Sequence, residues 1–268
     1  MQHIIIFTDL DGTLLDQAYS FHDALPALEL IRERAIPLVI CSSKTRAEIE
    51  HYRKRLNNRH PFISENGGGI FIPKGYFDPG LITLAGSASE DEYYHIIRLG
   101  ARYGDLREAL RQLKDKGFGI RGFGDMNAEE LADVTGLSLN EAGMAQRRDF
   151  DEPFLFDGDE DASRELFSGI KGMGFNFTQG SFYHILGNSD KGRAVSILIG
   201  LYQKVYGEVK SIAIGDSPND FPMLEATDVA ILVRRADGRH AAGHNIPNII
   251  LQEGIGPSGW NKALLKII

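Results

Sequence analysis

Uninterrupted apolar runs recur along the chain and predict strands that are buried on both faces. We expect strands at 3–7, 37–41, 62–63, 70–72, 211–214 and 229–233. Stretches with apolar residues at helical spacing lie between these runs, at 24–35, from 45 onward and over 190–206. Strands that alternate with helices are typical of a parallel sheet covered on both sides. The pattern therefore predicts an α/β fold with a Rossmann-like core.

Between residues 84 and 186 the pattern changes. Helical stretches at 105–116, 127–134 and 160–171 are interleaved with short apolar runs at 94–99, 154–156 and 182–186. We interpret this part as an α+β cap domain inserted into the core. The predicted division is 1–83 and 187–268 for the core and 84–186 for the cap. Glycine-containing joints near 80–86 and 187–188 are the expected hinges of a closing cap.

Composition narrows the class of protein. At ~150 residues per domain, 268 residues are long enough for nearly two domains. Cys41 is the single cysteine, so no internal disulfide can form. The net charge of −8 argues against wholesale binding of nucleic acid or of an anionic membrane. The N-terminal residues lack a basic leader, and the apolar run at 4–7 is too short for a membrane helix. We expect a cytoplasmic protein; its oligomeric state is left open.

Polar residues follow several of the predicted strands, where ligands of α/β proteins gather. They are Asp9 and Asp11 after the first strand, Ser42 after the second, Lys191 at a helix start, and Asp216 with Asp220 after a late strand. Carboxylates suit a hard divalent cation, and a hydroxyl, an ammonium and free helix N–H groups suit phosphate oxygens. This set of groups predicts phosphoryl transfer.

Each of these residues has an expected role. Asp9 attacks phosphorus, with Mg²⁺ shared between Asp9, the main-chain carbonyl of Asp11 and Asp216 to reduce charge repulsion. Asp11 then acts as general acid and, for hydrolysis of the aspartyl-phosphate, as general base. Ser42 donates to a phosphoryl oxygen and Lys191 supplies positive charge. Asp220 can hold a water bound to the metal.

The ordered motifs resemble those of the haloacid dehalogenase superfamily of Mg²⁺-dependent phosphatases. The matching residues are Asp9-x-Asp11-Gly12-Thr13, Ser42, Lys191 and Gly215-Asp216-x-x-Asn219-Asp220. The stretches 42–48, 61–67, 72–76 and 188–192 are similar to the mannosyl-3-phosphoglycerate phosphatase family. This resemblance implies a Rossmann-like core with an inserted cap. It also implies hydrolysis of mannosyl-3-phosphoglycerate to phosphate and mannosylglycerate, a compatible solute.

The resemblance also suggests where a phosphorylated sugar-glycerate would be held. Relatives often have a basic residue before the cap's Phe-Tyr pair, whereas this chain has Ser181. We therefore consider Lys44, Arg147 and Arg148 for the glycerate carboxylate, because lysine or a bidentate arginine binds that group best. For the sugar and the rest of the substrate we expect Glu65, Asn66, Gln179, Ser181, Tyr183, His184 and Asn219. The plainer reading makes His184 a buried histidine and residues 65–67 a sharp turn.

Other functions remain open at this point. Within the same chemistry they are a broader sugar phosphatase, a sucrose-phosphate-type phosphatase and a phosphomutase. A phosphoryl-accepting receiver module would use similar groups, but its acceptor aspartate lies on a later strand and it needs no large insert. A binding protein without catalysis is disfavoured because both Asp9 and Asp11 are present.

Overall fold

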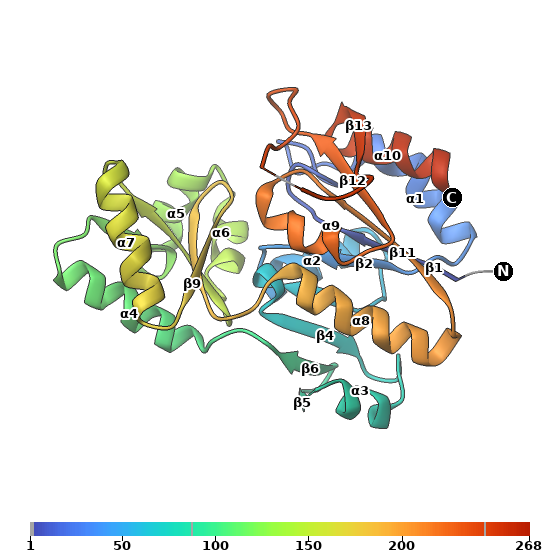
Figure 1. The fold of residues 1–268 in the computed structure, drawn as a ribbon, viewed down its shortest axis with the longest axis horizontal. Coiled ribbons are helices and arrows are strands. Elements are labelled where there is room, and N and C mark those ends of the chain that lie inside the picture. Colours follow the sequence, from blue (N-terminus) through green and yellow to red (C-terminus); the bar gives the residue numbers. More distant parts are fainter. Residues whose placement is uncertain (1–2, 87, 244) are drawn as a thin grey trace.

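The computed structural model describes residues 3–86, 88–243 and 245–268 and contains two β-sheets (Figure 1). The larger sheet has nine strands in the order β13-β12-β11-β1-β2-β3-β4-β6-β5. Its strands are β1 (His3–Thr8), β2 (Leu38–Cys41), β3 (Phe62–Ser64), β4 (Gly69–Pro73), β5 (Ala88–Glu90), β6 (Tyr94–Arg98), β11 (Val209–Gly215), β12 (Val229–Arg234) and β13 (Ile250–Ile255). No helix in the described ranges is long and apolar enough to cross a membrane.

The six strands from β13 to β3 run parallel, and β4, β6 and β5 continue the sheet antiparallel. Successive side chains of a strand point to opposite faces. In β1, Ile6 therefore packs into one core cluster, and Ile5 and Phe7 pack into the other. This arrangement confirms the predicted α/β fold and explains the uninterrupted apolar runs.

Helices cover both faces of the larger sheet. On one face lie α1 (Leu25–Glu33), α2 (Arg46–Arg55) and α10 (Gly256–Ile267), which contribute Ile31, Ile49 and Trp260 to the core. On the other lie α3 (Pro79–Ala85), α8 (Lys191–Tyr206) and α9 (Phe221–Glu225), whose core residues include Leu198 and Met223. Because the helices cover the two faces, the carboxyl ends of the parallel strands are bordered by loops.

The smaller sheet has the order β7-β8-β10-β9 and lies beside the larger one (Figure 1). Its strands are β7 (Ile120–Gly122), β8 (Asp151–Phe156), β9 (Asn176–Gln179) and β10 (Tyr183–Leu186). Helices α4 (Tyr103–Asp115) and α7 (Glu160–Gly172) pack on one face of it, against Phe154 and Ile185. Two shorter helices, α5 (Ala128–Thr135) and α6 (Leu139–Ala145), share a separate small cluster with Phe123. Single 3-10 turns lie at His22–Ala24, Glu65–Gly67, Phe123–Asp125 and Pro218–Asp220.

The chain passes from the larger sheet to the smaller one later than we predicted. Strands β5 and β6, which we expected in the cap, pair with β4 in the larger sheet because Tyr94, Ile96 and Ile97 complete its core. The expected hinge at 80–86 falls instead on α3, which is anchored by buried Ile82. The chain crosses between β6 and α4, and returns between β10 and α8. The division into core and cap domains stays a prediction, with its first boundary best placed after β6.

Candidate active site

A cavity of about 760 Å³ lies between the carboxyl-end edge of the larger sheet and the open face of the smaller sheet. Many of the residues singled out in the sequence line it, from both sheets. They are Asp9, Asp11, Lys44, Arg148, Gln179, Ser181, His184, Asp216 and Asn219. The parallel topology thus brings together groups separated by more than 200 positions in the chain, as expected for loops at one sheet edge.

Three buried carboxylates and one ammonium lie together at the cavity and are called its floor below: Asp9 and Asp216 line the cavity, and Asp220 and Lys191 are buried against them. Asp9, Asp216 and Asp220 each offer an oxygen within 4.8 Å of the others. The Nζ of Lys191 donates to Asp9 Oδ1 at 2.7 Å and to Asp220 Oδ1 at 2.6 Å. The Lys191 side chain is 1% exposed, so its charge is compensated by these carboxylates and not by water. Three of the four clusters that the sequence predicted to converge, those of Asp9, of Lys191 and of Asp216 with Asp220, therefore meet here.

Backbone N–H groups and one hydroxyl group of the surrounding loops hold Asp216 and Asp220 in place. The second oxygen of Asp220 accepts hydrogen bonds from the backbone N–H groups of Asp216, at 3.0 Å, and Ser217, at 3.1 Å. The hydroxyl of Thr13 donates to Asp216 Oδ1 at 3.2 Å. Gly12 has φ +76°, and a Cβ there would lie 2.7 Å from Asp216 Oδ2. The glycine of the first motif is thus required by both backbone conformation and space.

The site holds more negative than positive charge. Burial raises the pKa of Asp9 well above its usual value, against the effect of Lys191, and Asp220 and Asp216 raise it further. Burial and Asp220 raise the pKa of Asp216 to about 7. Burial would lower the pKa of Lys191, but the carboxylates of Asp220 and Asp9 raise it above its usual range. Clustered carboxylate oxygens with excess negative charge fit a hard divalent cation.

Asp11 lies apart from this floor. Its Oδ2 pairs with Lys44 Nζ at 3.1 Å, and Lys44 also contacts Glu48 Oε1 at 3.3 Å. Its Oδ1 has no hydrogen-bond partner among the described residues. The Asp11 side chain is 42% exposed and lines the cavity, whereas its carboxylate does not belong to the three-carboxylate group. Metal binding through its main-chain carbonyl stays a prediction.

Ser42 ends β2 beside the cavity but is fully buried. Its Oγ accepts a hydrogen bond from the backbone N–H of Lys44 at 3.2 Å, which shapes the loop that leads into α2. The neighbouring Ser43, not Ser42, lines the cavity. The predicted contact between Ser42 and a phosphoryl oxygen therefore remains a prediction.

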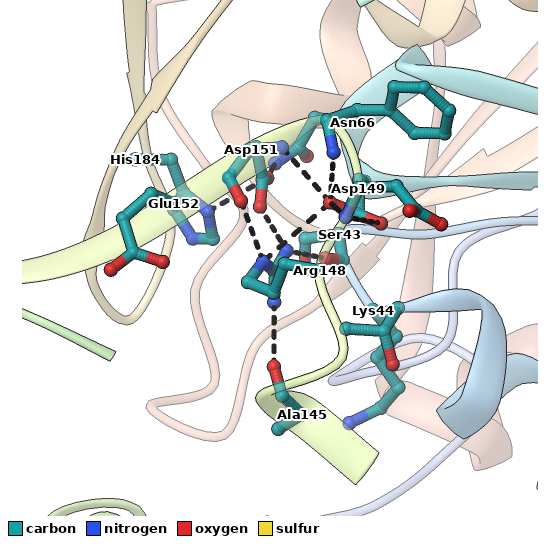
Figure 2. Close-up of polar contacts among 12 residues, drawn as sticks. Ser43, Lys44, Asn66, Ala145, Arg148, Asp149, Asp151, Glu152 and His184 are labelled. Carbon is teal, nitrogen blue, oxygen red and sulfur yellow. Dashed lines mark hydrogen bonds and ion pairs between the residues drawn. The ribbon is translucent and has the colours of Figure 1, made fainter. Parts of the chain in front are cut away.

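A buried polar network joins the two sheets around Glu65 and Arg148 (Figure 2). The Glu65 carboxylate accepts hydrogen bonds from the backbone N–H groups of Asp149, Phe150 and Asp151, at 2.7–3.1 Å. Burial raises the pKa of Glu65 to about 8, although Arg148 and the N–H groups of Phe150 and Asp151 act to lower it. Arg148 donates to the Ser43 carbonyl at 2.8 Å and pairs with Asp151. Glu65 and Arg148, expected to hold substrate, are thus both engaged between the sheets.

The same network continues through amide and imidazole groups. Asn66 Nδ2 donates to Asp151 Oδ2 at 2.9 Å, and Asn219 Nδ2 donates to Asn66 Oδ1 at 3.1 Å. His184 Nδ1 lies 3.0 Å from Asp151 Oδ2. Burial opposes ionisation of Asp151, but Arg148 and His184 together lower its pKa. His184 is therefore a buried, partnered histidine that also lines the cavity.

Strand alternation separates two residues that we expected to share a role. His184 lines the cavity, so its neighbour Tyr183 points to the opposite face of β10. Tyr183 packs there against Phe154 and Phe167 in the core under α4 and α7. A contact between Tyr183 and the sugar does not agree with this position. Arg147 is exposed and is not part of the cavity wall.

Some cavity residues were not singled out from the sequence. Ser43 and Tyr19 lie beside Lys44, whose Nζ is 4.9 Å from the centre of the Tyr19 ring. Arg235 lines the cavity from the loop that follows β12. A signal for Arg235 was present, since it lies two positions after the end of a predicted strand, as Asp9 and Asp216 do. The sequence could not show that this strand lies beside the one that ends at Asp216.

Comparison with known proteins agrees with this geometry. The model of the haloacid dehalogenase-like hydrolase family matches residues 6–242. Over its whole length the chain is 45% identical to a glucosyl-3-phosphoglycerate/mannosyl-3-phosphoglycerate phosphatase of Methanococcoides burtonii, of which 98% is covered. It is 39% identical to the mannosyl-3-phosphoglycerate phosphatase of Pyrococcus horikoshii, over 92% of this chain and 96% of that one.

Solved structures show the same fold at lower identity. A phosphatase of the same superfamily from Bacteroides thetaiotaomicron has a TM-score of 0.67 at 18% identity, over 99% of this chain and 95% of that one. A Thermoplasma acidophilum protein has a TM-score of 0.66 at 17% identity, over 99% and 98%. With this family match, these relatives and three of the four motif clusters meeting at one sheet edge, the chain belongs to the haloacid dehalogenase-like hydrolases, in the family of the mannosyl-3-phosphoglycerate phosphatases.

Proposed function

We propose that this protein hydrolyses the phosphate ester of mannosyl-3-phosphoglycerate, glucosyl-3-phosphoglycerate or both, releasing the glycosylglycerate and phosphate. The observation that carries the proposal is Asp9, which lines a cavity large enough for a phosphorylated disaccharide-sized ligand while Lys191 holds its carboxylate from below. The substrate class rests on the printed activities of relatives that match the full chain.

Asp9 is the proposed nucleophile. Its Oδ1 is bound by Lys191, which fixes the carboxylate and leaves Oδ2 to attack phosphorus. Attack forms the Asp9–phosphorus bond, breaks the bond from phosphorus to the glyceryl oxygen, and leaves an aspartyl-phosphate. The positive charge of Lys191 reduces repulsion between two anions, and this effect is strong because the ammonium is buried.

Asp11 is the proposed general acid. Its carboxyl group lines the cavity, is not bound by Lys191, and lies outside the three-carboxylate group of Asp9, Asp216 and Asp220. It donates a proton to the departing glyceryl oxygen and then accepts one from the water that hydrolyses the aspartyl-phosphate. Lys44 orients the Asp11 carboxyl through Oδ2 and leaves Oδ1 without a partner among the described residues.

Mg²⁺ is the proposed cofactor, with Asp9, Asp216 and Asp220 as the candidate side-chain ligands. When bound, the ion would neutralise charge on the phosphoryl oxygens and on the attacking carboxylate. Thr13 orients Asp216, and the backbone N–H groups of Asp216 and Ser217 orient Asp220. These contacts fix the ligand oxygens before any ion binds.

A substrate panel tests the proposal. Phosphate release is measured from mannosyl-3-phosphoglycerate, glucosyl-3-phosphoglycerate and simple hexose phosphates, with Mg²⁺ and with a chelator. We expect metal-dependent release and a kcat/KM that favours one or both glycosyl-phosphoglycerates. Equal or better kcat/KM for the hexose phosphates would instead indicate a broader sugar phosphatase, and stable phosphoprotein without turnover would indicate a phosphoryl acceptor.

A further inference from the structure

The positive charges that line the cavity are unequally available to a ligand. Of the described residues in its wall, three carry a permanent positive charge: Lys44, Arg148 and Arg235. A glycosyl-3-phosphoglycerate carries a carboxylate as well as its phosphate, and a carboxylate in such a wall needs a cation or several N–H donors. One of these three cations must therefore be available to bind the substrate carboxylate.

Two of the three cations are already engaged. Lys44 is 7% exposed and pairs with both Asp11 and Glu48. Arg148 is 3% exposed, pairs with Asp151 and donates to three main-chain carbonyl groups. Taking either one for substrate would leave buried acceptors without donors, which is costly.

Arg235 differs from both. Its side chain is 42% exposed, and its ion pair is a single 3.4 Å contact with Asp237, which is itself 51% exposed. Its Nε has no hydrogen-bond partner among the described residues. An exposed pair of this kind contributes little, so the guanidinium can exchange it for a ligand.

The main chain holds Arg235 in place at the correct edge. Its N–H donates to the Arg239 carbonyl at 2.9 Å, and the Gly238 N–H donates to the Arg235 carbonyl at 2.8 Å. This tight turn follows β12, which pairs with β11 just before Asp216. Arg235 therefore approaches the cavity from the same edge as the reacting groups, and the carboxylate of a 3-phosphoglyceryl group lies only a few bonds from its phosphorus.

We infer that Arg235 is the specificity-determining residue that binds the glycerate carboxylate, through the two parallel N–H donors of its guanidinium. The inference rests on the proposed function and deepens it. It replaces the assignment of that carboxylate to Lys44, Arg147 or Arg148.

The test compares two substrates that differ only at this group: mannosyl-3-phosphoglycerate and its analogue with a hydroxymethyl group in place of the carboxylate. The measured quantity is the ratio of their kcat/KM values. In Arg235→Gln we expect this ratio to fall about 10- to 100-fold, the loss expected for a charge-assisted hydrogen-bonded pair. Arg235→Lys should keep part of the preference, because it retains the charge but not the planar fork. Arg239→Gln, in the same turn but outside the cavity wall, is the matched control and should keep the wild-type ratio.

The same measurements distinguish failure of the proposed function from failure of the role assigned to Arg235. If the wild-type enzyme prefers hexose phosphates to mannosyl-3-phosphoglycerate, the proposed function fails. If the wild type hydrolyses mannosyl-3-phosphoglycerate with preference and the folded Arg235→Gln and Arg235→Lys variants keep the wild-type ratio, the role of Arg235 is overturned. Far-ultraviolet circular dichroism establishes folding, and should the glutamine variant not fold, the lysine variant alone decides by the same ratio.

Discussion

At the scale of single residues, the floor of the cavity depends on mutual compensation. Lys191 is buried between Asp9 and Asp220, and Asp220 also accepts two backbone N–H groups. Each partner therefore satisfies a group that would otherwise be buried and unpaired. Asp11 has a different environment, being half-exposed and paired with Lys44. Two aspartates separated by one residue are thus prepared for different chemical roles.

This difference predicts distinct defects. Asp9→Asn should abolish phosphate release and the covalent intermediate, because an amide cannot attack phosphorus. Asp11→Asn should still form the intermediate but lower kcat by about 10²- to 10⁴-fold, the usual contribution of a positioned acid or base. Rapid quench followed by mass spectrometry measures the phosphorylated protein. Exposed Asp23→Asn is the control, and equal loss of the intermediate in both active-site variants would contradict these roles.

The positions of the proposed catalytic residues could be predicted from sequence where their motifs follow strands. Parallel strands carry whatever follows them to one edge, so the positions of Asp9 and Asp216 needed no side-chain detail, whereas Ser42 proved to be buried beside the cavity and not part of its wall. The residues that bind substrate could not be predicted in the same way, because their availability depends on tertiary contacts that the sequence does not show. Glu65 and Arg148 carry the expected charges, yet each is engaged by backbone groups of the other sheet. The position of Tyr183 was deducible, since strand alternation forbids it to face the cavity together with His184.

At the scale of elements, α2 shows how a local signal also connects distant segments. Thr45 caps the helix by accepting a hydrogen bond from the Glu48 N–H, and Glu48 accepts one from the Thr45 N–H. This capping box was visible in the sequence. The Thr45 hydroxyl also lies 2.9 Å from the Met144 carbonyl, to which it donates. The start of α2 is therefore tied to the end of α6. The C-terminal helix α10, by contrast, was not foreseen, although Trp260, Ala263 and Leu264 have helical spacing.

This double role gives a prediction for Thr45→Ala. The variant loses both the helix cap and the contact with Met144, so the free energy of unfolding should fall by about 2 kcal/mol, the upper part of the range for cap removal. Ser138→Ala removes a similar capping box from α6, where the exposed Ser138 side chain bonds only Glu141 among the described residues, and should cost about 1 kcal/mol or less. Urea denaturation measures both. A larger loss for the Ser138 variant would contradict the role of the Met144 contact.

At the scale of the whole molecule, the two sheets are joined by a few buried polar contacts around Glu65. Glu65 and Asn66 adopt left-handed φ values of +48° and +55°, which are uncommon for residues other than glycine. Such backbone is held only where surrounding contacts compensate for it. Here the compensation comes from the N–H groups of the segment that leads into β8.

Glu65→Ala should therefore loosen one sheet against the other. The amides of Asp149, Phe150 and Asp151 lose their shared acceptor, so their hydrogen exchange should become faster, while amides within α8 should change little. Hydrogen–deuterium exchange with mass spectrometry measures this. Glu90→Ala, on exposed β5, is the control, and unchanged protection of residues 149–151 would contradict the role of Glu65 in joining the two sheets.

Stability should also depend on pH through His60. Burial, with a contribution from Arg53, lowers the pKa of His60 to about 4, whereas in the unfolded chain its pKa is about 6.5. Between these values the unfolded chain binds a proton that the folded protein does not. The folded state is therefore most favoured above about pH 6.5, and its advantage should decline by about 2 kcal/mol as pH falls toward 4, after allowance for partial solvent access.

Urea unfolding at about pH 7.5 and about pH 5 measures this dependence. His60→Gln cannot take up the proton, so the difference in unfolding free energy between the two conditions should shrink. Exposed His22→Gln should keep the wild-type difference. An undiminished difference in the His60 variant would show that other groups cause the acid sensitivity.

In the strands of the smaller sheet, side chains that line the cavity alternate with side chains that pack in the core. Pro153, Thr178 and His184 face the cavity, whereas Phe154, Phe177, Tyr183 and Ile185 pack in the core under α4 and α7. Replacing Pro153 or Thr178 should therefore alter the cavity wall without disturbing the core beneath, whereas replacing His184 would also remove its contact with Asp151. Proteins with the same chemistry can in this way differ in the sugar that they accept. A library of variants confined to these cavity-facing positions should change substrate selectivity with little loss of thermal stability.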